Sequence, residues 1–97
     1  MAENYIDYDV VKEASKTYSS QAEALANVVQ TLTKTNAVMK EGFKNETSNA
    51  FMERYESEYE VALKKAGEAL QSISEFLTTY VNKRMEEDGN TAVHIAG

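Results

Sequence analysis

The chain has 97 residues, no cysteine, no proline and a formal net charge of −6. This length allows at most one domain, and the lack of cysteine excludes disulfide bonds as a source of stability. The negative charge argues against nucleic acid and anionic membrane surfaces as partners, and no apolar run approaches the ~20 residues that span a bilayer.

The N-terminal segment lacks the features of a cleaved signal peptide. Residues 1–6 include an acidic residue and no apolar core segment, so we expect a protein that stays in the cytoplasm or leaves by a leaderless route. Asp7 predicts the start of a helix, because its carboxylate can accept hydrogen bonds from the free amides of a first turn.

A first long helix is predicted over residues 8–40. Its apolar positions recur at alternating steps of three and four, which is typical of a stripe that faces a core. Gln21 and Thr35 interrupt the stripe, and Ala22 and Val29 widen it on one side. The stripe consists of Val11, Ala14, Tyr18, Leu25, Val28, Leu32 and Met39.

A turn is predicted over residues 41–46. It contains Gly42, Phe43 and Asn45, and glycine and asparagine are the residues that most readily adopt positive φ. We expect Asn45 to let the chain reverse and Phe43 to pack the bend. The chain is therefore predicted to be all-α, with two long antiparallel helices that form a hairpin.

The second helix is predicted over residues 47–86 and carries two adjacent apolar rows. We expect one row to meet the first helix and the other to be left for a partner, although both could also fit one broad hairpin core. The predicted partner interface is Leu63, Leu70 and Leu77 with Ala62 and Ala66. The row expected to face the first helix is Phe51, Tyr55, Tyr59, Ala62, Ala66, Ala69, Ile73, Phe76 and Tyr80.

Two further features concern the second helix. Gly67 lies among small residues and costs a helix about 1 kcal/mol relative to alanine, which either a close helix contact or a tolerated accident would explain. The sequence Asp88-Gly89-Asn90 predicts a helix stop, so residues 87–97 are expected to form a flexible tail.

No catalytic, metal or cofactor site is predicted. His94 is the only histidine and has no second histidine or cysteine with which to share a metal. The acidic residues from Glu53 to Glu60 lack the Glu-x-x-His repeats of di-metal helical bundles, and a solvated acidic face explains them better. The sequence favours a protein that binds other helices over an enzyme.

The organisation resembles the WXG family, small helical hairpin proteins of type VII secretion systems. Family members carry Trp-x-Gly in the turn, followed by a polar stretch, a small residue and Phe. Here the corresponding residues are Phe43, Asn45, Ala50 and Phe51. Phenylalanine can fill an apolar tryptophan slot, and asparagine tolerates positive φ better than other non-glycine residues.

The family's export signal is Tyr-x-x-x-Asp/Glu just after the second helix. In this chain Tyr80 is followed by Arg84 in place of the acid. The resemblance therefore implies a protein that depends on a partner for export.

The resemblance implies a non-enzymatic secreted substrate, or a targeting partner of a larger toxin with an LXG domain. It implies a homodimer, or a heterodimer with a related hairpin, that forms a four-helix bundle, and contacts with a toxin and the secretion ATPase. Export would be leaderless, from the cytoplasm. The alternative is a cytoplasmic helical adaptor or coiled-coil assembly subunit unrelated to secretion.

Overall fold

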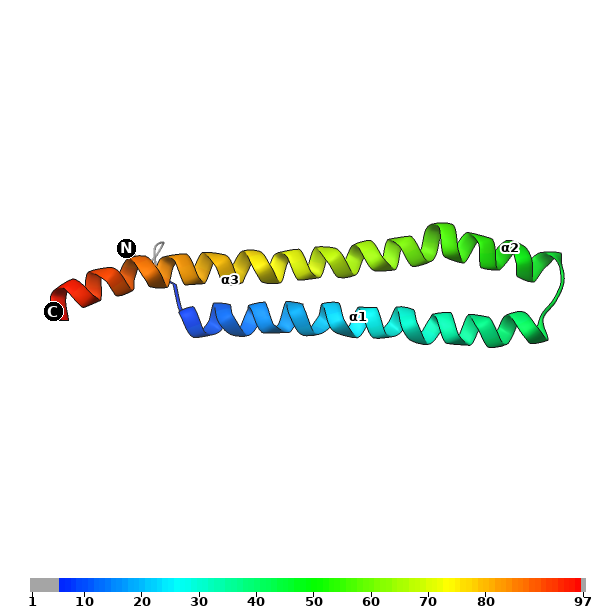
Figure 1. Ribbon diagram of the computed structural model, residues 1–97, viewed down its shortest axis with the longest axis horizontal. Coiled ribbons are helices and arrows are strands. Elements are labelled where there is room, and N and C mark those ends of the chain that lie inside the picture. Colours follow the sequence, from blue (N-terminus) through cyan, green and yellow to red (C-terminus); the bar gives the residue numbers. More distant parts are fainter. Residues whose placement is uncertain (1–5, 97) are drawn as a thin grey trace.

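The computed structural model describes residues 6–96, with side chains described for residues 6–88. Helix α1 (Tyr8–Gly42) forms one arm of a hairpin. The second arm returns antiparallel to it through α2 (Glu46–Arg54), a π-helix (Tyr55–Tyr59) and α3 (Glu60–Ala96) (Figure 1). The molecule is a rod of 73 × 21 × 17 Å, and residues 6–96 contain no strand. The predicted all-α helical hairpin is confirmed.

Local side-chain contacts explain where the helices begin. The Asp7 carboxylate accepts a hydrogen bond from the Val10 amide at 3.2 Å, so Asp7 is the N-cap of α1, as predicted. At the turn, Asn45 accepts from the Ser48 amide at 3.0 Å, and the Ser48 hydroxyl accepts from the Asn45 amide at 3.3 Å. These reciprocal bonds form a capping box that satisfies free donors at the start of α2.

The expected role of Asn45 in the turn is corrected by its backbone geometry. Asn45 has φ −157° and ψ −179°, which is extended backbone, and no described residue has positive φ. The chain reverses over residues 43–45, after α1 has continued to Gly42. Asn45 is therefore selected here as a helix cap, because its side-chain oxygen is well placed to accept from the first turn.

The predicted helix stop at Asp88-Gly89-Asn90 is wrong, because α3 continues to Ala96. One glycine within a helix costs about 1 kcal/mol, which is not enough to end a helix that has no proline beyond it. His94 lies outside the residues whose side chains are described.

The side of α1 that faces the second arm is centred differently from the predicted stripe. Ser15, Ala22 and Val29 are buried, whereas Tyr18 and Val28 are 37% and 45% exposed. The buried residues recur every seven positions and alternate with the half-buried Leu25, Leu32 and Met39. The predicted stripe is therefore rotated: Ala22 and Val29, which were expected at its side, lie at the centre of the contact, and the small polar Ser15 joins them there.

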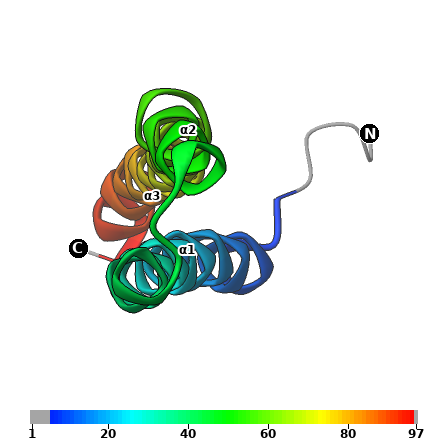
Figure 2. The same ribbon diagram turned by 90° about the vertical axis from the view of Figure 1, so that its right-hand side faces the viewer.

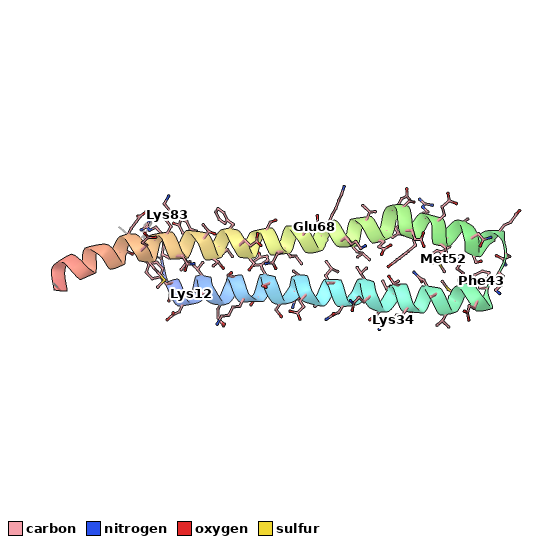
Figure 3. All side chains as sticks on the ribbon, viewed as in Figure 1. Lys12, Lys34, Phe43, Met52, Glu68 and Lys83 are labelled. Carbon is pink, nitrogen blue, oxygen red and sulfur yellow. The ribbon has the colours of Figure 1, made fainter. Side chains whose placement is uncertain are left out.

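The second arm shows the same kind of rotation. Ser48, Met52, Tyr55, Ser74 and Val81 are buried, and Leu63, Leu70 and Leu77 are half-buried. Apart from Tyr55, the row predicted to face the first helix is exposed. We use the name seam for the buried and half-buried residues of α1 and of the second arm at which the two arms face each other. Figure 3 shows Met52 on the side of α2 that faces α1 and Phe43 at the turn.

Small residues in the seam bring the two arms into direct contact. The Ser15 hydroxyl donates to the Ser74 carbonyl at 2.9 Å, and the Ser74 hydroxyl donates to the Ser15 carbonyl at 2.8 Å. Near the middle of the rod, a Cβ added to Gly67 would lie 3.9 Å from Leu25 Cδ2. This is an ordinary contact distance, so a close approach does not require glycine there. The end-on view in Figure 2 shows that the arms cross obliquely.

Candidate partner-binding surface

One side of the hairpin exposes a broad set of apolar side chains, which we call the open face. From α1 it takes Tyr18 and Val28, and the half-buried Leu25 and Leu32 lie at its base. From α3 it takes Ala62, Ala66, Ala69, Ile73, Phe76 and Tyr80, with Tyr59 from the π-helix. Tyr59, Ile73 and Tyr80 are 45%, 39% and 40% exposed.

A groove on the opposite side of the hairpin identifies the flank of each helix that belongs to the open face. The groove has a volume of about 870 Å³ and is lined by Ala26 and Glu23 from α1 and by Lys64 and Glu68 from α3, among others. Successive residues of an α-helix are rotated by about 100°, so residues on the flank of each helix opposite the groove point away from it. Tyr18 and Val28 on α1 and Ala66 and Ile73 on α3 lie on that flank.

The two sides differ in how charges are placed. The residues of the open face are uncharged, and charges lie at its edge: the Arg54 guanidinium is 5.8 Å from the Tyr59 ring centroid, and Glu75 and Lys83 line a hollow with Phe76 and Tyr80. The groove carries Glu23 and Lys34 from α1 and Glu60, Lys64 and Glu68 from α3, and Lys64 pairs with Glu60 at 3.4 Å. A contiguous apolar patch with charges at its edge is the side that a protein partner would cover.

The predicted interface residues lie at and beside this face. Ala62 and Ala66 are exposed on it. Leu63, Leu70 and Leu77 are half-buried in the seam beneath it, and Leu63 also lines the groove. Sequence reasoning missed the contribution of α1, namely Tyr18 and Val28. The signal that could have revealed it is the absence of charge on that flank of the first helix.

The three residues of the predicted turn motif do not form one cluster. Phe43, at the end of α1, is 40% exposed, so its ring packs the bend only in part. Phe51 is 42% exposed and stacks on the buried Tyr55 with 6.4 Å between ring centroids. Phe51 is thus held as an ordered aromatic ring at the turn end of the surface.

Near the other end, Tyr80 and Arg84 occupy successive turns of α3. Tyr80 stacks on Phe76 with 6.3 Å between ring centroids. Arg84 is half-buried, and its Nε is buried without a hydrogen-bond partner. The arginine therefore occupies the place of the expected acid as a partly desolvated cation.

Within the described residues, no group of His, Cys, Asp and Glu could hold a metal ion. Among the side chains that the structure describes, the pKa of one group is clearly shifted: a hydrogen bond to Glu58 raises the pKa of the exposed Arg54. The described helices also include none that is both long and apolar enough to cross a bilayer.

Comparison with known proteins gives one result. Comparisons with curated proteins and with solved structures find no significant match. The model of the WXG100 family, described as proteins of 100 residues with WXG, matches residues 5–88. Since that range covers most of the chain and both arms of the hairpin, the protein belongs to the WXG100 family of small helical proteins associated with type VII secretion.

Proposed function

We propose that the chain is a non-enzymatic component of a type VII secretion system that acts by pairing with a second helical hairpin, either its own copy or a related chain. In this role it is a secreted substrate or the targeting partner of a larger effector. The observation that carries the proposal is the apolar open face, to which both arms of the hairpin contribute exposed side chains.

The exposed area supports a partner. A compact monomer of 10.8 kDa has an accessible surface of about 5,500 Å², whereas this chain exposes 7550 Å². The excess of about 2,000 Å² is of the order that one subunit buries in an obligate dimer. A two-helix hairpin without disulfides gains stability by burying that surface in a four-helix bundle.

The predicted interface residues have distinct roles in this proposal. Ala62 and Ala66 are small, so the partner helix can approach α3 closely around them. Leu63, Leu70 and Leu77 already pack in the seam, and their exposed atoms would be covered by the partner. The association is hydrophobic, at about 25 cal/mol per Å² of apolar area removed from water.

Arg84 supports export in a complex with a partner. An arginine in place of the acid removes the charge that the family's Tyr-x-x-x-Asp/Glu signal requires, so we propose that the signal comes from the partner in the complex. Tyr80 then contributes to the open face and not to an autonomous signal.

Export from a host that carries a type VII system tests the function. The tagged chain should appear in the culture medium, and deletion of the secretion ATPase should retain it in the cells. Ala66→Glu places a charge on the open face and should reduce export, while the matched Ala26→Glu in the groove should not. A chain that stays in the cells whether or not the ATPase is present would favour the cytoplasmic adaptor instead.

A further inference from the structure

Asn36 and Tyr55 place polar atoms in the seam that have no hydrogen-bond partner. The atoms are Asn36 Nδ2 and the Tyr55 hydroxyl oxygen, and both are buried. Tyr55 as a whole is only 7% exposed. Both groups donate hydrogen bonds to water when they are exposed, and a donor that leaves water without gaining an acceptor destabilises the folded state. The seam is therefore weakened where these two side chains lie.

Arg84 Nε is also buried without a partner, but its situation differs. A guanidinium has five N–H donors, and the other nitrogens of Arg84 either bond or reach solvent. In Tyr55 the hydroxyl is the only polar group of the side chain. Burial therefore removes all of the polar hydration of that side chain.

The pairing of the two arms can be followed along the seam. The Ser15 hydroxyl bonds to the Ser74 carbonyl. Seven residues further along α1, the Ala22 carbonyl oxygen lies 4.0 Å from a Cβ built on Gly67, which is seven residues back along α3. Because both helices rise equally per residue, each step of seven on α1 matches a step of seven on α3.

This pairing brings Asn36 and Tyr55 to one level of the rod, beside the π-helix. Two further steps of seven lead from Ala22 to Asn36. On the second arm the same two steps cross the π-helix, which takes one residue more than an α-helical turn, and they end at Met52. Tyr55 follows Met52 by three residues, so both lie on the same side of the second arm, and both are buried. The two unpaired donors thus belong to the same section of the seam.

The two ends of the rod differ in the bonds that join the arms. Toward the chain termini, the Ser15 hydroxyl bonds to Ser74. Near the start of α1, the Tyr8 hydroxyl donates to the Asp88 carboxylate. Within residues 31–59, all of which the structure describes, the side-chain hydrogen bonds stay within one arm. Side-chain hydrogen bonds therefore tie the arms together away from the turn and not beside it.

Apolar burial beside the turn is also limited. Met52 and Tyr55 are buried there, whereas Phe43 and Phe51 are 40% and 42% exposed. A section of a protein with few buried apolar contacts opens locally at a lower free energy than the rest of the fold. The section beside the turn combines this limited burial with two unpaired donors.

We propose that residues 33–59, which we call the turn end, open as a unit while the arms stay paired over the rest of the rod. Opening lets water bond to Asn36 and Tyr55, which offsets part of the free energy lost by exposing the seam. The rest of the seam has no such gain, because Ser15 and Ser74 would lose the bonds between them. The motion lies within a single chain and does not depend on the proposed function.

Opening of the turn end changes what the chain presents to a partner. The buried Met52 and Tyr55 become accessible beside Phe51, which stacks on Tyr55 in the closed state. A partner that contacts these side chains binds the open state better and shifts the population toward it. The turn end is therefore the part of the hairpin that can adapt its shape on binding.

Hydrogen exchange of the full chain, followed by mass spectrometry, tests the proposal. After correction for intrinsic rates, the amides of residues 33–40 and 50–57 should exchange at least about tenfold faster than those of residues 18–29 and 63–77. Ser15→Ala should speed exchange in the second set and leave the first within about twofold, because the turn end opens without breaking the serine pair. Equal rates of the two sets in the wild type, or equal acceleration of both by Ser15→Ala, would mean that the arms separate only as a whole and would overturn the proposal.

Tyr55→Phe tests the role of the unpaired donors. It removes the hydroxyl and keeps the ring, so exchange at the turn end should slow at least about fivefold, as expected when one unsatisfied buried group is removed. Asn36→Leu should slow it likewise. Tyr59→Phe is the matched control, because Tyr59 lies in the same π-helix and is 45% exposed, and it should leave exchange within about twofold. Unchanged or faster exchange in Tyr55→Phe or Asn36→Leu would show that the donor is already satisfied in the closed state, and the proposal would fail.

Discussion

The hydroxyl pair in the seam makes a quantitative prediction about what holds the two arms in register. Ser15 and Ser74 are 5% and 6% exposed, and each hydroxyl donates to the other residue's carbonyl, at 2.9 and 2.8 Å. Their oxygens are also 3.1 Å apart. Removing one hydroxyl leaves buried polar atoms on the other residue with fewer partners, which costs about 1–2 kcal/mol.

Single and double alanine variants measure the two hydrogen bonds. Ser15→Ala and Ser74→Ala should each lower the free energy of unfolding by about 1–2 kcal/mol, and the double variant should lose about the sum, because each hydroxyl donates to a backbone carbonyl that alanine retains. Urea unfolding followed by circular dichroism, at one protein concentration, measures all four values. Ser20→Ala, at an exposed helical position, is the control. It measures the increase in the free energy of unfolding, up to ~0.5 kcal/mol, that alanine gives through its higher helix propensity.

The bridge between the arms would be refuted if Ser15→Ala or Ser74→Ala behaved like Ser20→Ala. That result would mean that the hydroxyls are hydrated in solution and do not bridge the arms.

Three further predictions concern single residues and are read from thermal melts by circular dichroism. Gly67→Ala should raise the melting temperature by about 4 °C, because a methyl group has room beside Leu25; a lower temperature would show that the arms are closer there. Asn45→Ala should lower the free energy of unfolding by about 1 kcal/mol as the loss of a cap. Asn45→Ala and Ser48→Ala made together should cost less than the sum of the two single changes, since the two caps are reciprocal. Phe43→Ala should cost about 1–2 kcal/mol, below the 3–5 kcal/mol of a buried ring, and a larger loss would mean that the ring is buried in solution.

The architecture could be predicted because it depends on long-range periodicity and on the scarcity of turn residues. Alternating steps of three and four over more than thirty residues indicate amphipathic helices whatever their exact phase. The position of the turn followed from Gly42, Phe43 and Asn45 lying between two such segments.

The phase of the helices could not be predicted from the size of the apolar residues. The buried contact between the arms uses Ser15, Ala22 and Ser74, which a hydrophobicity count ranks low; small residues allow close approach, and the two serines bond across the contact. The larger Val28, Ile73 and Phe76 were therefore assigned inward although they are exposed.

Three local features also could not be predicted from the sequence. The π-helix becomes visible only when the eight-residue step between Tyr55 and Leu63 is compared with the seven-residue steps around it. Asn45 suited both a positive-φ turn and a helix cap, and only the backbone geometry decides between them. The C-terminal extent of α3 depends on small propensity differences that no single residue determines.

The central claim is that the open face, and not the groove, binds the partner. Ala66→Glu and Ala26→Glu introduce the same side chain at exposed helical positions on opposite sides of the rod. Light scattering coupled to gel filtration should give the wild type and Ala26→Glu twice the chain mass of 10.8 kDa, and Ala66→Glu the mass of one chain. A dimeric Ala66→Glu together with a monomeric Ala26→Glu would contradict the account.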